Sequence, residues 1–160
     1  MPHNRKRQPR TNDRLHLDRF IPYRLSVLTN TVSMSIARAY EREFGLSIPE
    51  WRVMAVLARY PDLSAIEVAE RTAMDKVAVS RAVSTLLSHG RLTRSYDETD
   101  KRRSILRLSQ SGLAVYKKVA PLALRYERKL LNALSAADRR ALDQLVSALM
   151  ERARRIAAQW

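Results

Sequence analysis

The sequence predicts a mainly α-helical protein with one small β-hairpin, and three patterns support this fold class. Apolar residues recur at steps of three and four over most of the chain, which is typical of helices with one buried face. Two short alternating segments, 92–96 and 104–108, flank a charged stretch without any apolar residue, which is typical of a hairpin. Since 46% of the residues are apolar and 29% are charged, the chain can bury a core.

The first two predicted helices are separated by a glycine. Apolar residues follow a helical pattern from about His16 to Phe44, and Gly45 is expected to end this helix because glycine adopts the left-handed conformation at little cost. A second helix carries Pro49 in its first turn, where proline is tolerated, and ends before Pro61.

Two short helices follow, and each has residues that can cap its first turn. Ser64 and Glu67 form a predicted capping box for a helix that ends near Thr72. Asp75 can cap the next helix, which is predicted to end near Gly90.

Two long helices are predicted after the hairpin. Ser109 is expected to cap a helix that runs to about Ala133 and bends at Pro121, because proline lacks an N–H and its ring clashes with the preceding turn. Ser135 and Asp138 form a further predicted capping box for the last helix. This helix carries an apolar stripe of Leu142, Leu145, Val146, Leu149, Ala153, Ile156, Ala157 and Trp160.

The chain is strongly basic and contains no cysteine. Lysine and arginine number 30 against 16 acidic residues, and the net charge of +14 favours binding to polyanions, nucleic acid before anionic membrane. Without cysteine there is no disulfide, zinc finger or thiolate nucleophile. The three histidines have no metal-ligand spacing, so we expect neither a metal nor a cofactor.

Membrane and enzyme functions have little support in the sequence. No apolar run approaches the roughly 20 residues that span a bilayer, and no apolar segment follows the basic start as it would in a secretory signal. We therefore expect a cytoplasmic protein without a membrane partner. A phosphate-binding glycine loop and a nucleophile constellation are both missing, so no catalytic residue is predicted and an enzyme is not expected.

The helix that begins after Asp75 has two different faces. Its inward face is expected to be apolar and to contain Val79, Val83, Leu86 and Leu87. Its outward face is expected to present Val77, Arg81, Ser84 and Ser88, flanked by Ala78 and Thr85. In a DNA major groove, Arg81 can bond a guanine edge bidentately, and Val77 or Ala78 can contact a thymine methyl. The alternative is an ordinary amphipathic helix with a hydrated face, but the lack of acidic residues after Asp75 favours the groove.

The predicted hairpin is also basic. Lys101, Arg102 and Arg103 lie at its tip, and Arg94 and Arg107 lie on its strands. An arginine on a narrow tip can enter a minor groove, where the potential is most negative. The alternative is a mixed-charge surface loop, but the neighbouring helix favours a winged helix-turn-helix domain. The predicted DNA contacts are Lys76, Val77, Ala78, Ser80, Arg81, Ser84, Arg94, Lys101, Arg102 and Arg103.

Three motifs resemble the MarR family of bacterial regulators. Asp100-Lys101-Arg102 matches the D-x-R motif of the family's wing. Residues 108–112 are similar to its L-T-x-x-G segment, with serine in place of threonine. Residues 90–94 are similar to its G-L-[IV]-x-R segment, with Arg91 where leucine is commoner. The resemblance covers about residues 16–158 and implies a triangular dimer in which the first helix and the last two helices interlock.

A homodimer is also expected from the residues themselves. The apolar stripe of the last helix is too long for a small winged domain to cover, so a second chain should cover it. One helix and one wing give modest affinity, whereas a dimer can contact two half-sites about 34–36 Å apart on one duplex face. The operator is therefore expected to be roughly palindromic.

The resemblance implies an effector pocket between the dimerisation helices and the DNA-binding domain. Residues 29–35 place poor helix formers inside the first helix, where they can line a cavity or simply allow two helices to approach closely. Family members often sense aromatic carboxylates or their CoA thioesters, which implies such an effector here; without cysteine, peroxide sensing is excluded. The candidate effector contacts are Arg24, Asn30, Ser33, Arg38, Trp51 and Arg52, although arginines on such helices are often only solvated.

These observations predict four parts and one function. The parts are a flexible basic tail (1–14), an N-terminal dimerisation helix (15–47), a winged helix-turn-helix domain (48–108) and C-terminal dimerisation helices (109–160). The predicted function is a homodimeric repressor that binds double-stranded DNA at a palindromic operator and is released by a small aromatic acid or its CoA thioester. The alternative is an architectural DNA-binding protein without an effector. An RNA-binding function is less supported because the strands lack aromatic stacking platforms.

Overall fold

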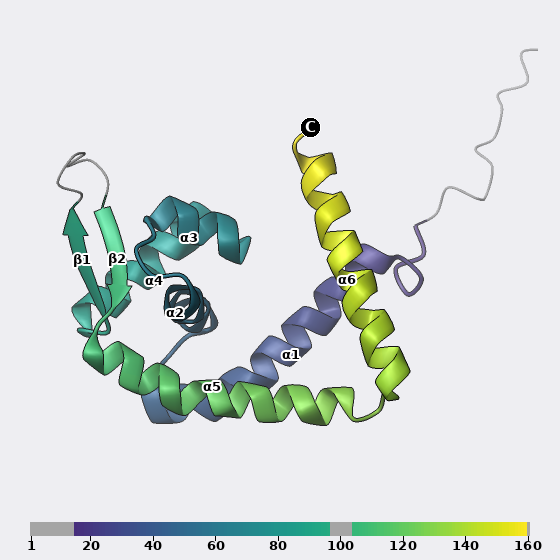
Figure 1. The fold of residues 1–160 in the computed structure, drawn as a ribbon, viewed down its shortest axis with the longest axis horizontal. Helices are drawn as coiled ribbons and strands as arrows, with labels where there is room; N and C mark the ends of the chain where they lie inside the picture. The colour runs from purple at the N-terminus through teal and green to yellow at the C-terminus, as the bar shows by residue number, and fades with distance from the viewer. Residues whose placement is uncertain (1–14, 97–103, 160) are drawn as a thin grey trace, which may run out of the picture.

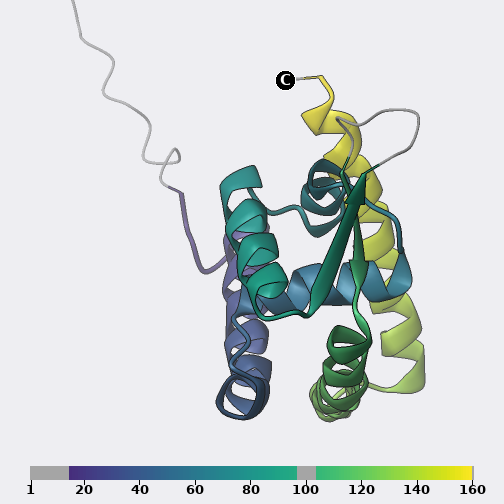
Figure 2. The same cartoon turned by 90° about the vertical axis from the view of Figure 1, so that its left-hand side faces the viewer.

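The computed structural model describes residues 15–96 and 104–159, and it confirms a mainly helical fold with one hairpin (Figure 1). Its elements are α1 (Ile21–Phe44), α2 (Ile48–Arg59), α3 (Ala65–Thr72), α4 (Lys76–Ser88), β1 (Leu92–Tyr96), β2 (Ser104–Leu108), α5 (Gln110–Leu131) and α6 (Ala136–Ala157). Figure 1 shows the hairpin and α4 at one end of the molecule and α6 at the other, and in Figure 2 the hairpin end faces the viewer.

The elements from α2 to β2 form what we call the winged lobe. Val53 on α2, Val68 on α3 and Val83 on α4 are almost completely buried, so the three helices meet in one core. The two strands are antiparallel, and Leu92 pairs with Leu108. Leu106 of β2 also donates its backbone N–H to the carbonyl oxygen of Leu63, at 2.8 Å. This bridge attaches the hairpin to the α2–α3 loop.

Side-chain caps define the starts of α2 to α6, as the sequence predicts for α3 and α4, whereas α1 begins without one. The Ser64 and Glu67 capping box is present, and the Asp75 carboxylate accepts the backbone N–H of Ala78 at 2.8 Å. At α6 the prediction of a capping box is wrong in its second half. The Ser135 hydroxyl accepts the N–H of Asp138, but the Asp138 carboxylate accepts the serine hydroxyl at 2.6 Å instead of a backbone N–H.

The long helices differ slightly from their predicted bounds. Helix α1 begins at Ile21 and not near His16, because the preceding residues form a turn and Pro22 favours a helix start. Helix α5 continues through Pro121 and ends at Leu131. In the part of the chain that the structure describes, no helix is long and apolar enough to cross a membrane.

Helix α6 contributes nothing to the core of the chain. None of its residues between 136 and 157 is buried, and the N-terminal half of α1, residues 21–30, is exposed throughout. By contrast, the other half of α1 contains the buried residues Ala37 and Tyr40 and packs on the winged lobe. The long helices therefore leave apolar surface uncovered in a single chain.

Candidate nucleic-acid interface

Helix α4 has one buried and one exposed face, as its sequence predicts. Its buried side chains are Val79, Ala82, Val83 and Leu86, at steps of three, one and three residues. The prediction placed Leu87 on the inward face, but Leu87 is only partly buried, and Ala82 completes that face instead. The outward positions hold Lys76, Val77, Ser80, Arg81 and Ser84, all exposed, with Ala78 partly buried at their edge.

Hydrogen bonds separate the outward hydroxyl groups into two sets. Near the end of α4, Thr85 donates to the carbonyl of Arg81 at 3.1 Å, and Ser88 donates to the carbonyl of Thr85 at 2.8 Å. Ser80 and Ser84, nearer the middle, have no such partner among the described residues. Together with the guanidinium of Arg81, their hydroxyl groups are available to a ligand that approaches this face.

The hairpin contributes a second exposed surface. Arg94 lies directly opposite the buried Leu106, so it projects from the side of the hairpin that faces the lobe, but its side chain is exposed. Arg107 forms an ion pair with Asp62 of the α2–α3 loop. The predicted tip contacts, Lys101, Arg102 and Arg103, lie outside the described residues.

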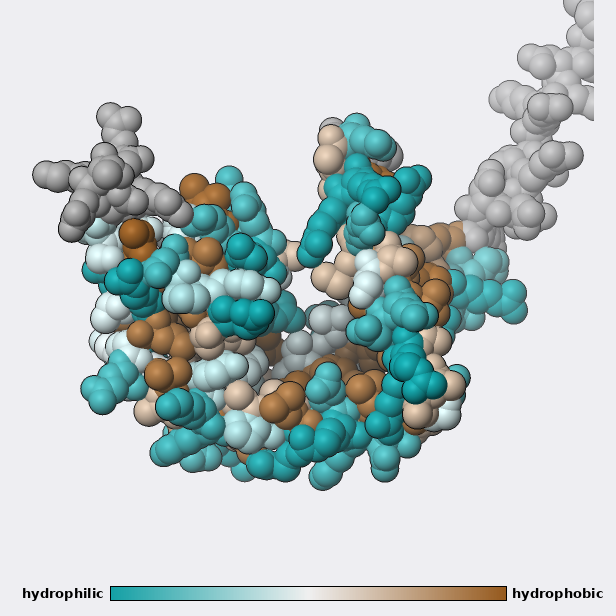
Figure 3. Space-filling model, viewed as in Figure 1, coloured by the Kyte–Doolittle hydropathy of each residue, from teal (hydrophilic) through white to brown (hydrophobic). Residues whose placement is uncertain are grey.

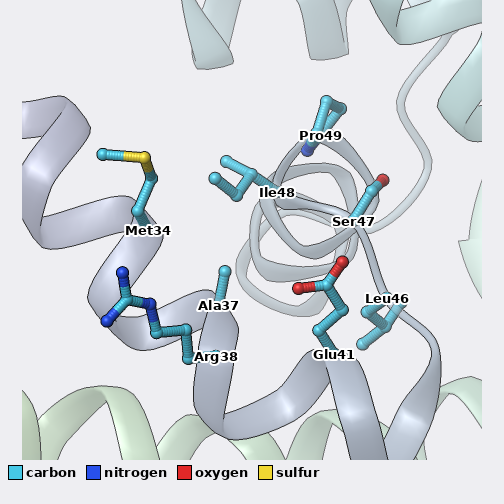
Figure 4. A pocket seen from close by; sticks show the side chains of 8 residues that line it. All are labelled: Met34, Ala37, Arg38, Glu41, Leu46, Ser47, Ile48 and Pro49. Carbon is cyan, nitrogen blue, oxygen red and sulfur yellow. The ribbon is translucent and has the colours of Figure 1, made fainter.

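A cavity of about 380 Å³ lies between α1 and the start of α2 (Figure 4). Met34, Ala37 and Ile48 supply apolar wall. Two charged side chains of α1, Arg38 and Glu41, also line the cavity. The remaining wall consists of Leu46, Ser47 and Pro49.

The structure separates the six candidate effector contacts. Arg38 lines the cavity. Arg24 and Asn30 are exposed on the N-terminal half of α1, and neither lines this cavity. Ser33 and Arg52 bond each other: the Arg52 Nη2 donates to the Ser33 Oγ at 3.1 Å. This bond joins α1 to α2.

Trp51 belongs to an aromatic cluster. Its ring stacks on Tyr116 of α5, with centroids 5.7 Å apart and an angle of 19°, and it contacts Tyr40 of α1 at 5.8 Å. Burial raises the pKa of Tyr40 to about 12, although the charge of Arg52 opposes this effect and Glu41 adds to it. Trp51 therefore holds three helices together.

Two more hollows lie between α1 and α5. One, of about 200 Å³, has Arg125 and Lys129 of α5 beside Tyr126, with no acidic residue in its lining. The other, of about 440 Å³, is mainly apolar and is lined by Val32, Ile36, Ala123, Leu124, Tyr126, Glu127, Leu130 and Leu131. Arg125 and Lys129 could not be found from the sequence, since helical spacing places them on one face of α5 without indicating that α1 lies beside it.

Comparisons with known proteins agree with this architecture. A model of the MarR family matches residues 44–103. A MarR/EmrR family regulator from Acinetobacter sp. ADP1 is 26% identical, with a TM-score of 0.81 over 88% of this chain and 99% of that one. PcaV from Streptomyces coelicolor, solved with its natural ligand, is 24% identical, with a TM-score of 0.74 over 88% and 98%. BpsR from Bordetella bronchiseptica is 20% identical, with a TM-score of 0.75 over 86% and 97%.

No curated protein matches the chain in sequence. The helix-turn-helix with its hairpin and the family match define a DNA-binding transcriptional regulator of the winged helix class. Residues 44–103 match the MarR family, and the chain shares the fold of a MarR/EmrR family regulator over most of its length.

Proposed function

We propose that the protein is a homodimeric repressor that binds a palindromic operator and leaves it when a small aromatic acid binds. The observation that carries the DNA-binding half is the exposed face of α4. This face combines one long donor, Arg81, with small side chains and has no acidic residue from Lys76 to Ser88. Such a face can approach base edges closely in a major groove.

The proposed DNA contacts have two roles. Arg81, with Val77, Ala78, Ser80 and Ser84, contacts base edges and supplies sequence preference. Lys76 contributes a charge at the start of the same helix. Arg94 and the tip residues Lys101, Arg102 and Arg103 contact phosphates or the minor groove and supply salt-dependent affinity.

Uncovered apolar surface supports the homodimer. On α6, Leu145, Leu149 and Met150 are each more than half exposed. Figure 3 shows apolar side chains along α5 and on the side of the molecule where α1 and α6 lie. A contiguous apolar surface of this kind is costly in water and marks an interface. A second copy would cover it, and the mainly apolar hollow between α1 and α5 would receive part of that copy.

Three observations support an effector that is a small aromatic acid. The 200 Å³ hollow presents Arg125 and Lys129 next to the ring of Tyr126 and to Leu122, which suits a carboxylate joined to one ring. The 380 Å³ cavity offers Arg38 beside an apolar wall, with Glu41 in the same lining. The DNA binding of the similar protein BpsR is regulated by 6-hydroxynicotinic acid, which is such a compound. A CoA thioester would have to extend far outside either hollow.

The shared position of α1 provides a mechanism for release. Its N-terminal half carries the surface that a second copy would cover, and its other half lines both charged hollows and packs on the winged lobe. A ligand bound beside α1 favours one arrangement of the two lobes over another, to the extent that it binds that arrangement more tightly. If the favoured spacing does not match the DNA repeat, the dimer dissociates from the operator.

The test begins with selection of binding sites from random duplex DNA by the full-length protein. The proposal expects an inverted repeat with half-sites about one turn apart. Release of this DNA is then measured with benzoate, 6-hydroxynicotinate and benzoyl-CoA, each against a control of hexanoate. Selection of no repeated motif, or DNA binding that no aromatic acid weakens, would overturn the corresponding half of the proposal.

The architectural alternative is tested with the same reagents. The high net charge alone predicts binding that falls steeply with salt and does not depend on sequence. Titration of selected and scrambled DNA at several salt concentrations distinguishes the two functions. Equal affinity for both DNAs at every salt concentration would favour the architectural protein.

A further inference from the structure

The guanidinium of Arg91 joins the winged lobe to the end of α1. Arg91 follows α4, and its Nη2 donates to the backbone carbonyl of Phe44, the last residue of α1. The last carbonyls of a helix have no partner within the helix and carry a partial negative charge. A charged donor is therefore well suited to this position.

Hydrogen bonds to the end of α4 hold the backbone at Arg91 in place. Its N–H donates to the carbonyl of Leu86 at 2.8 Å, and the N–H of Gly90, which has a φ of +65°, donates to the carbonyl of Leu87 at 3.0 Å. These two bonds form a Schellman motif that ends α4. The direction of the Arg91 side chain is thus tied to the last turn of α4, the proposed recognition helix.

Helix α5 closes the junction from the other side. The carbonyl of Arg91 accepts the N–H of Ser109 at 3.0 Å, and the hydroxyl groups of Ser109 and Ser111 both donate to the carbonyl of Gly90, at 2.6 and 2.7 Å. A Cβ on Gly112 would lie 2.0 Å from the Arg91 oxygen, so the first turn of α5 packs directly on this turn. The ends of α1 and α4 and the start of α5 all meet at Arg91.

We infer that Arg91 is a positioning residue that sets the angle of the recognition helix relative to α1, and thereby the spacing of the two recognition helices in the dimer. This inference rests on the proposed DNA-binding dimer. The serine and glycine contacts hold the turn to α5 but do not reach α1, which the Arg52–Ser33 bond and the buried Tyr40 hold beside α2. Among the described residues, the Arg91 side chain makes the polar contact from the α4–β1 turn to the end of α1.

The inference predicts which property of DNA binding depends on Arg91. Contacts within one half-site come from α4 and the hairpin, which do not involve the Arg91 side chain. Discrimination between half-site spacings requires that the two lobes resist rotation. One added base pair moves the half-sites apart by about 3.4 Å and turns one relative to the other by about 35°, since a turn has 10–10.5 base pairs. A lobe that has lost this contact with the end of α1 would follow the change more easily.

Removal of the side chain should leave the fold intact. Arg91 Nη1 is buried without a hydrogen-bond partner among the residues that the structure describes. The cost of burying this donor offsets part of the stability that the bond to Phe44 contributes. Methionine has a similar unbranched stem and no donor. Arg91→Met is therefore the test variant, and Arg91→Lys, which keeps the charge and one donor group, is the conservative variant.

A matched control removes a nearby charge without removing the link. The ammonium of Lys118 on α5 lies 5.9 Å from the ring centroid of Phe44, and the residue is exposed. Among the described residues it makes no hydrogen bond to the backbone of α1. Lys118→Met thus changes the charge near the end of α1 by the same amount as Arg91→Met. Any effect that is common to the two variants reports charge and not positioning.

The experiment measures the affinity of full-length protein for three DNAs: a single half-site, the selected operator, and that operator with one base pair inserted between its half-sites. We expect wild type and Lys118→Met to lose at least about tenfold in affinity on insertion, and Arg91→Met to lose no more than about threefold, with Arg91→Lys between them. Half-site affinity should be the same in all four proteins, which also shows that each has folded.

Two results would overturn the inference. One is an Arg91→Met variant that discriminates between spacings as strongly as wild type does. The other is a variant whose half-site affinity falls in parallel with its operator affinity, since this would indicate a general loss of structure in the winged lobe. A wild-type protein that is indifferent to spacing would instead contradict the proposed dimeric function, so the two failures are distinguishable.

Discussion

Arg52 of α2 and Ser33 of α1 are joined by a hydrogen bond of 3.1 Å, so two residues that the sequence suggests as effector contacts bind each other. The guanidinium is only partly exposed, and a donor that loses its partner in such a place is costly. The bond therefore helps to hold α1 against the winged lobe.

Ser33→Ala should weaken the fold because it leaves Arg52 without this acceptor. We expect the free energy of unfolding to fall by about 0.5–1 kcal/mol, the lost bond being partly offset by the higher helix propensity of alanine. Thermal or urea unfolding measures this. Ser35→Ala is the matched control: its hydroxyl bonds only the carbonyl of Thr31 within α1, so its stability should be unchanged or slightly higher. Equal effects of both changes would contradict the role given to the bond.

Arg81→Ala should reduce operator affinity by about 1–3 kcal/mol and relax the base preference at one position of each half-site. The physical reason is the loss of two hydrogen bonds to a base edge. Fluorescence anisotropy with operators changed at single positions would measure both effects. Arg128→Ala removes the same charge from an exposed position on α5 and should change affinity only slightly. An unchanged base preference in Arg81→Ala would show that α4 does not enter the groove as proposed.

Charges placed on the apolar stripe of α6 should separate the dimer. Leu145 and Leu149 are 63% and 52% exposed in the single chain, and glutamates in both positions would be buried unpaired in an interface. We expect a monomer by light scattering and a large loss of operator affinity with retained half-site binding. Ser147→Glu, on the opposite side of the same helix, should remain dimeric. A dimeric Leu145→Glu, Leu149→Glu double variant would exclude this stripe from the interface.

The raised pKa of Tyr40 makes stability depend on alkaline pH. The folded protein holds the phenol in its neutral form up to about pH 12, whereas the unfolded chain ionises near its ordinary pKa of 10.0. The contribution of Tyr40 is therefore complete below pH 10 and is lost as the pH rises from 10 to 12, by on the order of 2 kcal/mol. Urea unfolding of wild type and Tyr40→Phe across this range isolates the effect from lysine titration. Parallel pH profiles for the two proteins would contradict it.

Ala73→Gly should stabilise the protein. Ala73 ends α3 with φ at +51°, in the left-handed region, where a Cβ is unfavourable and glycine is not. The relief exceeds the extra entropy that glycine has in the unfolded chain, so we expect a gain of about 0.5–1 kcal/mol in unfolding free energy. Ala114→Gly, at an exposed position within α5, should instead lose about 1 kcal/mol. A loss in both variants would contradict the backbone argument.

Most local structure could be predicted from the sequence because its causes lie within a few residues. The cap at Asp75 and the buried face that includes Val79 and Val83 depend on neighbours three or four positions away. The strand bounds follow from alternation and from the charged stretch between the strands. The same logic failed where two local signals competed, as at the start of α1, where Pro22 decided the boundary.

The contacts between helices needed the tertiary structure, because periodicity shows which face of a helix is apolar but not which helix will lie against it. The sequence alone determined the order of the elements, the outward position of Arg81 and the surplus of apolar surface on α6. Only the folded chain placed Arg52 on Ser33, Arg91 on the end of α1, and Arg125 beside the same helix. Each of these pairs is separated by many residues, and its geometry depends on helix crossings that no local pattern encodes.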